Sequence, residues 1–126
     1  MKILIAGLGH IAARHIQNIK QLKPKAKISV LRQKSKNADL DHLAPFVTNI
    51  FFDVKEALAW RPQVTVITNP APFHIQTALP FAARGSHLFI EKPLSSHFKD
   101  IERLKHISRK NNLTVMGGYV MRFSDP

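Results

Sequence analysis

Three small residues at fixed spacing near the start of the chain form a pattern that could bind an anion. Gly7, Gly9 and Ala12 make a Gly-x-Gly-x-x-Ala turn directly after the apolar run of residues 2–6. The first glycine allows a tight turn, the second leaves no Cβ between backbone and phosphate, and the alanine lets a helix pack closely on a strand. The amide groups and positive dipole end of a helix starting here would face a diphosphate. In this context the pattern predicts a dinucleotide site, with a structural turn that binds nothing as the alternative. The expected contacts in this turn are Gly7, Gly9, His10 and Ile11.

A lysine between a carboxylate and a proline is the second candidate for chemistry. Residues 91–93 read Glu-Lys-Pro and follow an apolar run. An ammonium fixed there could donate a proton to a substrate, or stabilise an alkoxide while a hydride moves. We therefore assign Lys92 as the candidate catalytic residue, with an ordinary solvated loop as the alternative. The bond between Lys92 and Pro93 is also a candidate cis peptide.

The residues after the second expected strand bear on the choice of cofactor. Proteins that bind NAD usually carry Asp or Glu about twenty residues past the glycines, where the acid holds the ribose hydroxyls. This chain has Arg32, Gln33, Lys34 and Ser35 there instead. A guanidinium grips a 2′-phosphate through two parallel hydrogen bonds, whereas an acid repels it. The sequence therefore favours NADP over NAD, with Arg32 as the phosphate ligand. In the alternative, Arg32 stacks on adenine or points into water and either cofactor is accepted.

Alternating strand and helix patterns must position these residues. Strands are expected at 2–6, 27–32, 46–48 or 50–52, 64–68, 87–91 and 113–117, and helices at 13–22, 38–43, 54–60, 73–84 and 97–110. Such alternation predicts an α/β fold with a parallel sheet and helices on both faces. Right-handed crossovers give the doubly wound Rossmann order 3-2-1-4-5-6. Ligands of such sheets bind beyond the carboxyl ends of the strands. The residues brought to one crevice would be 7–11, 32–34, 68–70, 91–93 and 118 onward.

Local signals mark where several elements begin, end and face the core. Asp53 can cap a helix, Gly85 can end one, and Pro80 is expected to kink the helix that contains it. The helix expected at 73–84 would bury Ile75, Ala78, Leu79 and Ala82 on one face, and the helix expected at 97–110 would turn Phe98, Ile101, Leu104 and Ile107 inward.

Composition limits the classes of partner. The 126 residues suit one domain, and the formal net charge is +11. That charge would suit a nucleic-acid surface, an attraction for anionic cofactors, or one part of a larger protein whose remainder is acidic. The basic residues are scattered and are not interleaved with aromatics for base stacking, so no nucleic-acid partner is expected. The aromatics expected in the core are Phe46, Phe51, Phe52, Phe73, Phe81 and Phe89.

Membrane association, cysteine chemistry and metal binding are not expected. No apolar run approaches the ~18 residues of a membrane span, so no membrane association is expected. The absence of cysteine excludes disulfides and thiolate sites and fits a cytoplasmic protein. The seven histidines fall on different elements, so no metal site is expected.

Four motifs occur in an order that resembles one enzyme family. They are the glycine turn followed by Arg14-His15, then Asn69-Pro70 followed by His74, then Glu91-Lys92-Pro93, and finally Gly118-Tyr119-x-x-Arg122-Phe123 with Pro126. Together they resemble the cofactor-binding half of the Gfo/Idh/MocA oxidoreductases, the glucose–fructose oxidoreductase and inositol dehydrogenase family. The resemblance covers essentially the whole chain, and Glu-Lys-Pro is its most specific element.

The resemblance implies NAD(P)-dependent hydride transfer on a sugar, cyclitol or sugar-nucleotide derivative. Lys92 corresponds to the catalytic lysine, and Glu91 would lie by the nicotinamide ribose. The other residues implied to contact the cofactor are Thr68, Asn69, Pro70 and His74. The alternative from another class is a non-catalytic nucleotide-sensing or interaction domain on the same fold.

The resemblance also sets expectations for domain organisation. Residues 1–120 would form the NAD(P)-binding domain, and residues 121–126 would begin a linker to a C-terminal substrate domain that this chain lacks. The chain should then bind cofactor without turning over substrate by itself, and homo-oligomers are expected only for the full-length protein. Two departures from the family pattern are Val120, where a polar residue is common, and Pro80 inside a helix.

Overall fold

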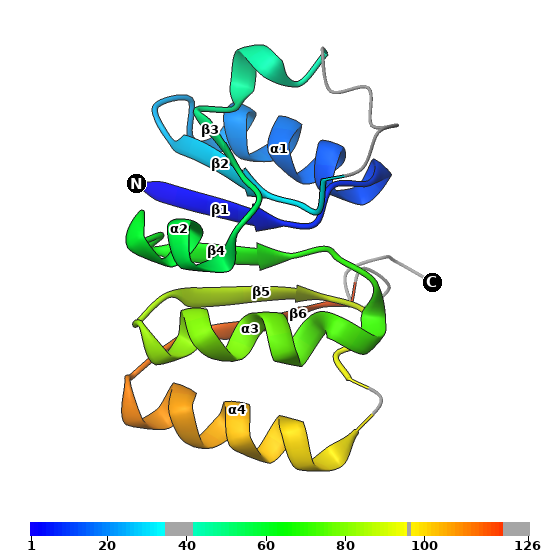
Figure 1. Ribbon diagram of the computed structural model, residues 1–126, viewed down its shortest axis with the longest axis vertical. Coiled ribbons are helices and arrows are strands. Elements are labelled where there is room, and N and C mark those ends of the chain that lie inside the picture. Colours follow the sequence, from blue (N-terminus) through cyan, green and yellow to red (C-terminus); the bar gives the residue numbers. More distant parts are fainter. Residues whose placement is uncertain (35–41, 96, 120–126) are drawn as a thin grey trace.

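A six-stranded parallel sheet forms the centre of the molecule (Figure 1). The computed structural model describes residues 1–34, 42–95 and 97–119. In sheet order the strands are β3 (Asn49–Phe51), β2 (Lys27–Leu31), β1 (Lys2–Ala6), β4 (Val64–Ile67), β5 (His87–Glu91) and β6 (Val115–Gly118). All five strand pairs are parallel. The predicted doubly wound order 3-2-1-4-5-6 is confirmed.

Helices connect the strands and begin close to where the sequence pattern placed them. The described residues form α1 (His10–Leu22), α2 (Val54–Ala59), α3 (His74–Ala83) and α4 (Phe98–Lys110), with short 3-10 turns η1 (Ala44–Phe46) and η2 (Ala71–Phe73). Helix α1 begins three residues before its predicted start, because its first two residues are exposed and only the later turns show the apolar periodicity. The helix expected at 38–43 lies largely outside the described residues.

The central strand β1 is buried on both faces of the sheet. Ile3 and Ile5 pack against Ala12 and Ile16 of α1 in one core. The alternate residues of β1 face a second core, to which three helices contribute (Figure 1). Burial on both faces is what a parallel sheet covered by helices requires. The helix residues of the second core are Ala57, Ile75, Ala78, Leu79, Phe81, Ala82 and Leu104.

Three of the phenylalanines predicted to lie in the core are exposed. Phe81 is fully buried, but Phe46, Phe52 and Phe73 are 37%, 49% and 57% exposed. Phe46 and Phe73 lie in the short 3-10 turns, and Phe52 follows the last residue of the edge strand β3. An apolar residue in a short turn or past a strand end has fewer neighbouring elements to cover it. The prediction is therefore wrong for these three residues.

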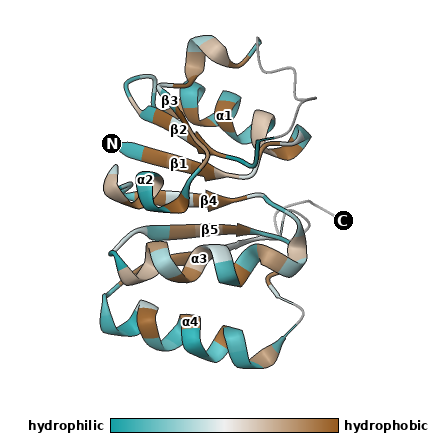
Figure 2. Cartoon of the chain, in the orientation of Figure 1, coloured by the Kyte–Doolittle hydropathy of each residue, from teal (hydrophilic) through white to brown (hydrophobic). Residues whose placement is uncertain are grey.

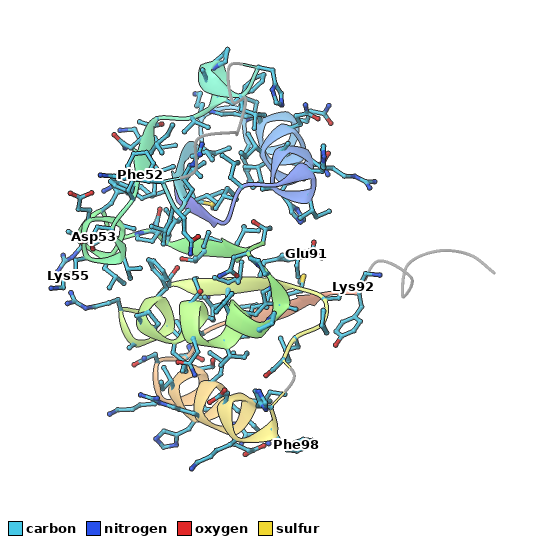
Figure 3. All side chains as sticks on the ribbon, turned by 45° about the vertical axis from the view of Figure 1, so that its right-hand side comes forward. Phe52, Asp53, Lys55, Glu91, Lys92 and Phe98 are labelled. Atoms are coloured by element: carbon cyan, nitrogen blue, oxygen red, sulfur yellow. The ribbon has the colours of Figure 1, made fainter. Side chains whose placement is uncertain are left out.

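The inward face predicted for α4 is correct only in its middle. Leu104 is buried, and Ile101 and Ile107 are half-buried. Phe98, however, is 83% exposed (Figure 3). It is the first residue of α4 and lies before the turns that pack on the molecule. Figure 2 shows α4 as mostly hydrophilic, in contrast to the strands.

Local signals for helix boundaries are borne out. The Asp53 carboxylate accepts a hydrogen bond from the Lys55 backbone N–H at 2.6 Å and caps α2. Gly85 has φ +85° just beyond α3, in the left-handed region that favours glycine. Pro80 lies inside α3 and does not end it, and the kink expected there stays a prediction. Among the described residues, no helix has both the length and the apolar character that crossing a membrane would take.

Strand register aligns the predicted site residues at one edge of the sheet. Ala6 lies opposite Leu31 of β2 and Ile67 of β4, and Ile67 lies opposite Ile90 of β5. The neighbouring strands β2, β1, β4 and β5 therefore end at the same level of the sheet. We call residues 7–11, 32–34, 68–70, 91–93 and 118–119 the carboxyl edge. Its residues at that level are Arg32, Gly7, Thr68, Glu91 and Gly118.

Candidate functional site

Gly7 cannot be replaced by a larger residue without moving its neighbours. Its φ is +104°, and a Cβ at this position would lie 2.5 Å from the backbone nitrogen of Asn69. The Gly7 N–H donates to Leu31 O at 2.9 Å, and the Thr68 hydroxyl donates to Gly7 O at 3.1 Å. The turn is thus held against both neighbouring strands by the close approach of backbone to backbone. Thr68, which we predicted to contact the cofactor, braces this turn.

Gly9, by contrast, borders open space. A Cβ built there would meet no atom within 4 Å, and its φ of −129° is accessible to any residue. Gly9 is the N-cap of α1, but no side chain caps this helix and its first turn has no acidic residue. The leading amide groups of α1 therefore have no competing side-chain acceptor at the cap. This combination fits a diphosphate, because an anion at that place meets amide donors and no side chain. His10 and Ile11, at the start of the helix, are both exposed.

The end of β2 is basic, as the sequence indicated. The Arg32 backbone N–H donates to Phe51 O at 3.0 Å, and its Nε donates to Gln33 O at 3.2 Å. The Lys34 ammonium lies 5.8 Å from the ring centroid of Phe52, a cation–π distance. No acidic residue occurs in the described part of this segment, residues 32–34. The described end of β2 therefore carries two cationic side chains, Arg32 and Lys34, and no carboxylate.

Asn69 offers a buried acceptor next to the glycine turn. Its Nδ2 donates to Thr77 Oγ1 at 2.7 Å. Its Oδ1 is buried and has no hydrogen-bond partner among the described residues. A buried polar atom of this kind costs free energy unless a ligand or water completes it. Asn69 Oδ1 can therefore accept from an N–H or O–H of a bound dinucleotide. Pro70, the next residue, is exposed.

The Glu91 carboxylate is held by the chain itself. His15 Nε2 lies 2.7 Å from Glu91 Oε1, and the Lys92 backbone N–H donates to Oε2 at 3.2 Å. A Cβ on Gly118 would come within 3.0–3.2 Å of the same carboxylate, so glycine in β6 leaves room for it. The His15 ring also packs edge-on against Phe89 at 5.1 Å. The Glu91 carboxylate, at the end of β5, therefore contacts α1 through His15 and lies against Gly118 of β6.

His15 is a site residue whose role sequence reasoning missed. Its contact with Glu91 spans 76 residues of sequence. A single sequence carries no signal for a pair so far apart. The one available indication is that His15 follows the glycine turn on a helix whose direction is fixed by that turn.

Lys92 lies where the sequence predicted, at the carboxyl end of β5 (Figure 3). It is exposed, and its bond to Pro93 is cis. The Glu91 carboxylate beside it is occupied by His15 and by the Lys92 backbone. Among the described residues, no ion pair of the Lys92 side chain is found.

His74 is buried and contacts the backbone of two segments of the carboxyl edge. It is 2% exposed, and its Nδ1 and Nε2 lie 2.8 Å from Pro93 O and 2.7 Å from Asn69 O. We predicted His74 as a cofactor contact, but both ring nitrogens are engaged by backbone carbonyls. A direct hydrogen bond from this ring to a cofactor would require breaking one of them.

A metal site would need several His, Cys, Asp or Glu side chains close together. Within the described ranges, no group of three or more His, Cys, Asp or Glu side chains is arranged to hold a metal ion. A surface hollow lined by Gln17, Lys20, Gln21 and Phe46 lies beside α1 and contains none of the carboxyl-edge residues. Val120, Arg122, Phe123 and Pro126, which belong to the fourth sequence motif or adjoin it, lie outside the described residues.

Comparison with known proteins agrees with this geometry. The chain is 26% identical over 98% of its length to 4-carboxy-2-hydroxymuconate-6-semialdehyde dehydrogenase of Sphingobium sp., and covers 40% of that protein. It is also 26% identical over 98% of its length to myo-inositol 2-dehydrogenase of Thermotoga maritima, of which it covers 37%. The chain thus spans about two fifths of the length of these relatives.

A solved structure shares the fold. Scyllo-inositol dehydrogenase from Lactobacillus casei, with bound NAD(H) and scyllo-inositol, matches 99% of this chain with a TM-score of 0.84 and 26% sequence identity. The match covers 38% of that chain. Residues 1–119 match the Gfo/Idh/MocA family, described as an oxidoreductase family with an NAD-binding Rossmann fold. This chain belongs to that family.

Proposed function

We propose that this chain is the cofactor-binding part of an NAD(P)-dependent oxidoreductase that transfers a hydride to or from a sugar, cyclitol or sugar-nucleotide derivative. One observation carries the proposal. The register of the sheet brings the open amide end of α1 and the exposed Lys92 to the same carboxyl edge. A dinucleotide held by its phosphates at the first can extend along that edge toward the second.

Different residues would bind different parts of the cofactor. The amides after Gly9 would hold the diphosphate, and Asn69 Oδ1 would accept from the cofactor. When bound, the nicotinamide would supply the hydride chemistry at its C4 position. The Lys92 ammonium would donate a proton to the substrate oxygen as a carbonyl is reduced, or hold the alkoxide in the reverse direction. His10, Ile11, Pro70 and Glu91 remain predicted to line the cofactor site.

For the cofactor we infer a preference for NADP. Arg32 and Lys34 supply two cations at the end of β2, where proteins specific for NAD place an acid. The Lactobacillus casei relative has NAD(H) bound, so the inference depends on this chain's own residues. Arg32 offers the planar donor pair that suits a phosphate.

The preference is tested by calorimetric titration of the chain with NADPH and NADH side by side. We expect NADPH to bind more tightly. Arg32→Glu should weaken NADPH binding about tenfold or more relative to NADH, since a lost charged hydrogen bond is worth ~1.5–3 kcal/mol. Arg103→Glu, with the same charge change on α4, is the control and should weaken both cofactors equally. An equal loss for both cofactors with Arg32→Glu would refute the preference.

The sugar-like substrate is proposed from the relatives. Inositol dehydrogenases occur among them, but so does an enzyme named for a carboxylated semialdehyde. Lys92→Ala in the complete enzyme should lower kcat about a hundredfold or more, the usual contribution of a general acid. Unchanged turnover would remove Lys92 as the general acid. A complete protein that binds the dinucleotide and turns over no such substrate would favour a nucleotide-sensing or interaction domain instead.

A further inference from the structure

His15 reaches the residue next to the candidate catalytic lysine from the helix that follows the glycine turn. We propose that His15 is a positioning residue, which fixes the backbone at Lys92 relative to α1 through the Glu91 carboxylate. The meaning of this link for catalysis rests on the function proposed above, in which α1 binds the diphosphate and Lys92 donates the proton. The link itself stands on the contacts of these side chains.

Two residues of β5 hold the His15 ring. Phe89 packs edge-on against it, with 5.1 Å between the ring centroids, and Glu91 Oε1 lies 2.7 Å from its Nε2. Phe89 and Glu91 are two residues apart in the strand, so their side chains leave the same face of the sheet. A single side chain of α1 therefore contacts both of them.

The contact between His15 and Glu91 does not depend on the charge of the ring. A carboxylate only accepts hydrogen bonds, so the contact requires a proton on Nε2. A neutral imidazole can carry its one proton there, and an imidazolium carries one there as well. Both side chains are partly exposed. Neither form of the ring therefore leaves a buried charge without a hydrogen-bond partner.

The Glu91 carboxylate transmits the contact to the lysine. Its second oxygen, Oε2, accepts from the Lys92 backbone N–H at 3.2 Å. The two oxygens thus have different donors, one on α1 and one in the turn after β5. A rotation of the carboxylate that breaks one contact would disturb the other. Gly118 of β6 borders the same group, because a Cβ there would lie 3.0–3.2 Å from it.

The hydrogen bond from Lys92 would not hold the Glu91 side chain by itself. It is a single bond of 3.2 Å in an exposed position, where water competes with it. A glutamate side chain also gains rotamer entropy when it is released. The shorter contact from His15 restricts that freedom. In the proposed enzyme, it would keep the lysine turn at a constant place relative to a diphosphate bound at the start of α1.

The first contact is tested on the unaltered chain by long-range ¹H–¹⁵N spectra of the histidine rings at neutral pH, without any cofactor. We expect the Nε2 of His15 to show the chemical shift of a protonated nitrogen. A bare Nε2, with the proton on Nδ1, would overturn the proposal.

The effect on the lysine is tested by comparing His15→Met with His15→Gln. Both side chains are flexible and of similar size, but only glutamine has an N–H that can donate to Glu91. In His15→Met, the amide proton signal of Lys92 should move upfield, because its hydrogen bond to Oε2 weakens. In His15→Gln, the signal should stay near its original place. His106→Met, on the exposed side of α4, is the matched control and should not move it. Equal shifts in His15→Met and His15→Gln, or no shift in either, would refute the positioning role.

A second variant applies if His15→Met fails to fold. Gly118→Ala displaces the same carboxylate and leaves both donors intact. The His15 Nε2 signal and the Lys92 amide signal should then move together, and movement of only one, or of neither, would overturn the proposal. All of these spectra are recorded without cofactor. If the link holds while NADPH and NADH both fail to bind the unaltered chain, the proposed function fails and the positioning inference stands.

Discussion

The two sides of the carboxyl edge are built by opposite means. Around the turn from β1 to α1, the site consists of backbone groups and of positions where side chains are missing, at Gly7 and Gly9. Around the turn after β5, it consists of side chains that hold the turn, with His15 on the Glu91 carboxylate and His74 on the Pro93 carbonyl oxygen. The first side should therefore fail when a side chain is added. The second should fail when one is removed.

The largest effect is expected from Gly7→Ala. The added Cβ would lie 2.5–2.8 Å from the backbone of Thr68 and Asn69, at a φ of +104°. Backbone strain and overpacking together should lower the free energy of unfolding by roughly 2–4 kcal/mol. Urea unfolding followed by circular dichroism measures this loss. A change below ~1 kcal/mol would show that the turn is not held against β4 as described.

Gly9→Asp adds a side chain to the same turn at a position with no atom in its way. The site is open, and aspartate is a better N-cap than glycine, so the stability should be unchanged or slightly raised. The carboxylate would, however, occupy and repel the place of a phosphate. Dinucleotide affinity should fall by a factor of about ten or more, the equivalent of ~1.4 kcal/mol. A variant that binds NADPH as tightly as the parent would remove Gly9 from the cofactor site.

The two sides of the carboxyl edge also differ in how much of each could be predicted from the sequence. The glycine turn was predictable because its requirement is local: small residues, a strand before them and a helix after them. The strand order followed from the alternation of elements and the handedness of crossovers. The position of Lys92 at the end of a strand was predictable because an apolar run precedes it and Pro93 follows it, while its catalytic role stays a prediction.

The other side could not be predicted in the same way. His15 and Glu91 are 76 residues apart, and their contact depends on how α1 lies on the sheet. The partners of His74 are backbone oxygens, which have no residue type to reveal them. Phe98 was assigned to the core by periodicity, but periodicity cannot show that a residue in the first turn of a helix is left exposed.

A double-mutant cycle of His15→Ala and Glu91→Ala tests the contact between the side chains of α1 and β5. The pair is partly exposed, with side chains 20% and 15% accessible, so water will replace part of the lost contact. We expect a coupling energy of about 1–2 kcal/mol in urea unfolding, in the range of hydrogen bonds to charged groups. Additive effects of the two substitutions would mean that the pair does not join α1 to β5 in solution.

Gly118→Ala should produce the smallest effect. Its Cβ would approach the Glu91 carboxylate at 3.0–3.2 Å, and that side chain can shift slightly to accept it. The stability should fall by about 1 kcal/mol. The amide signal of Lys92, whose N–H donates to this carboxylate, should move in the NMR spectrum. If only the amide signals of β6 moved, the Glu91 carboxylate would not contact the Lys92 amide as described.

The central claim is that one dinucleotide spans both sides of the edge. NMR titration of the ¹⁵N-labelled chain with NADPH tests it most directly. The amides of Gly9 and His10, Asn69 and Lys92 should shift together and with one dissociation constant, while those of α4 stay in place. Shifts confined to the glycine turn, or saturating at different concentrations on the two sides, would contradict it.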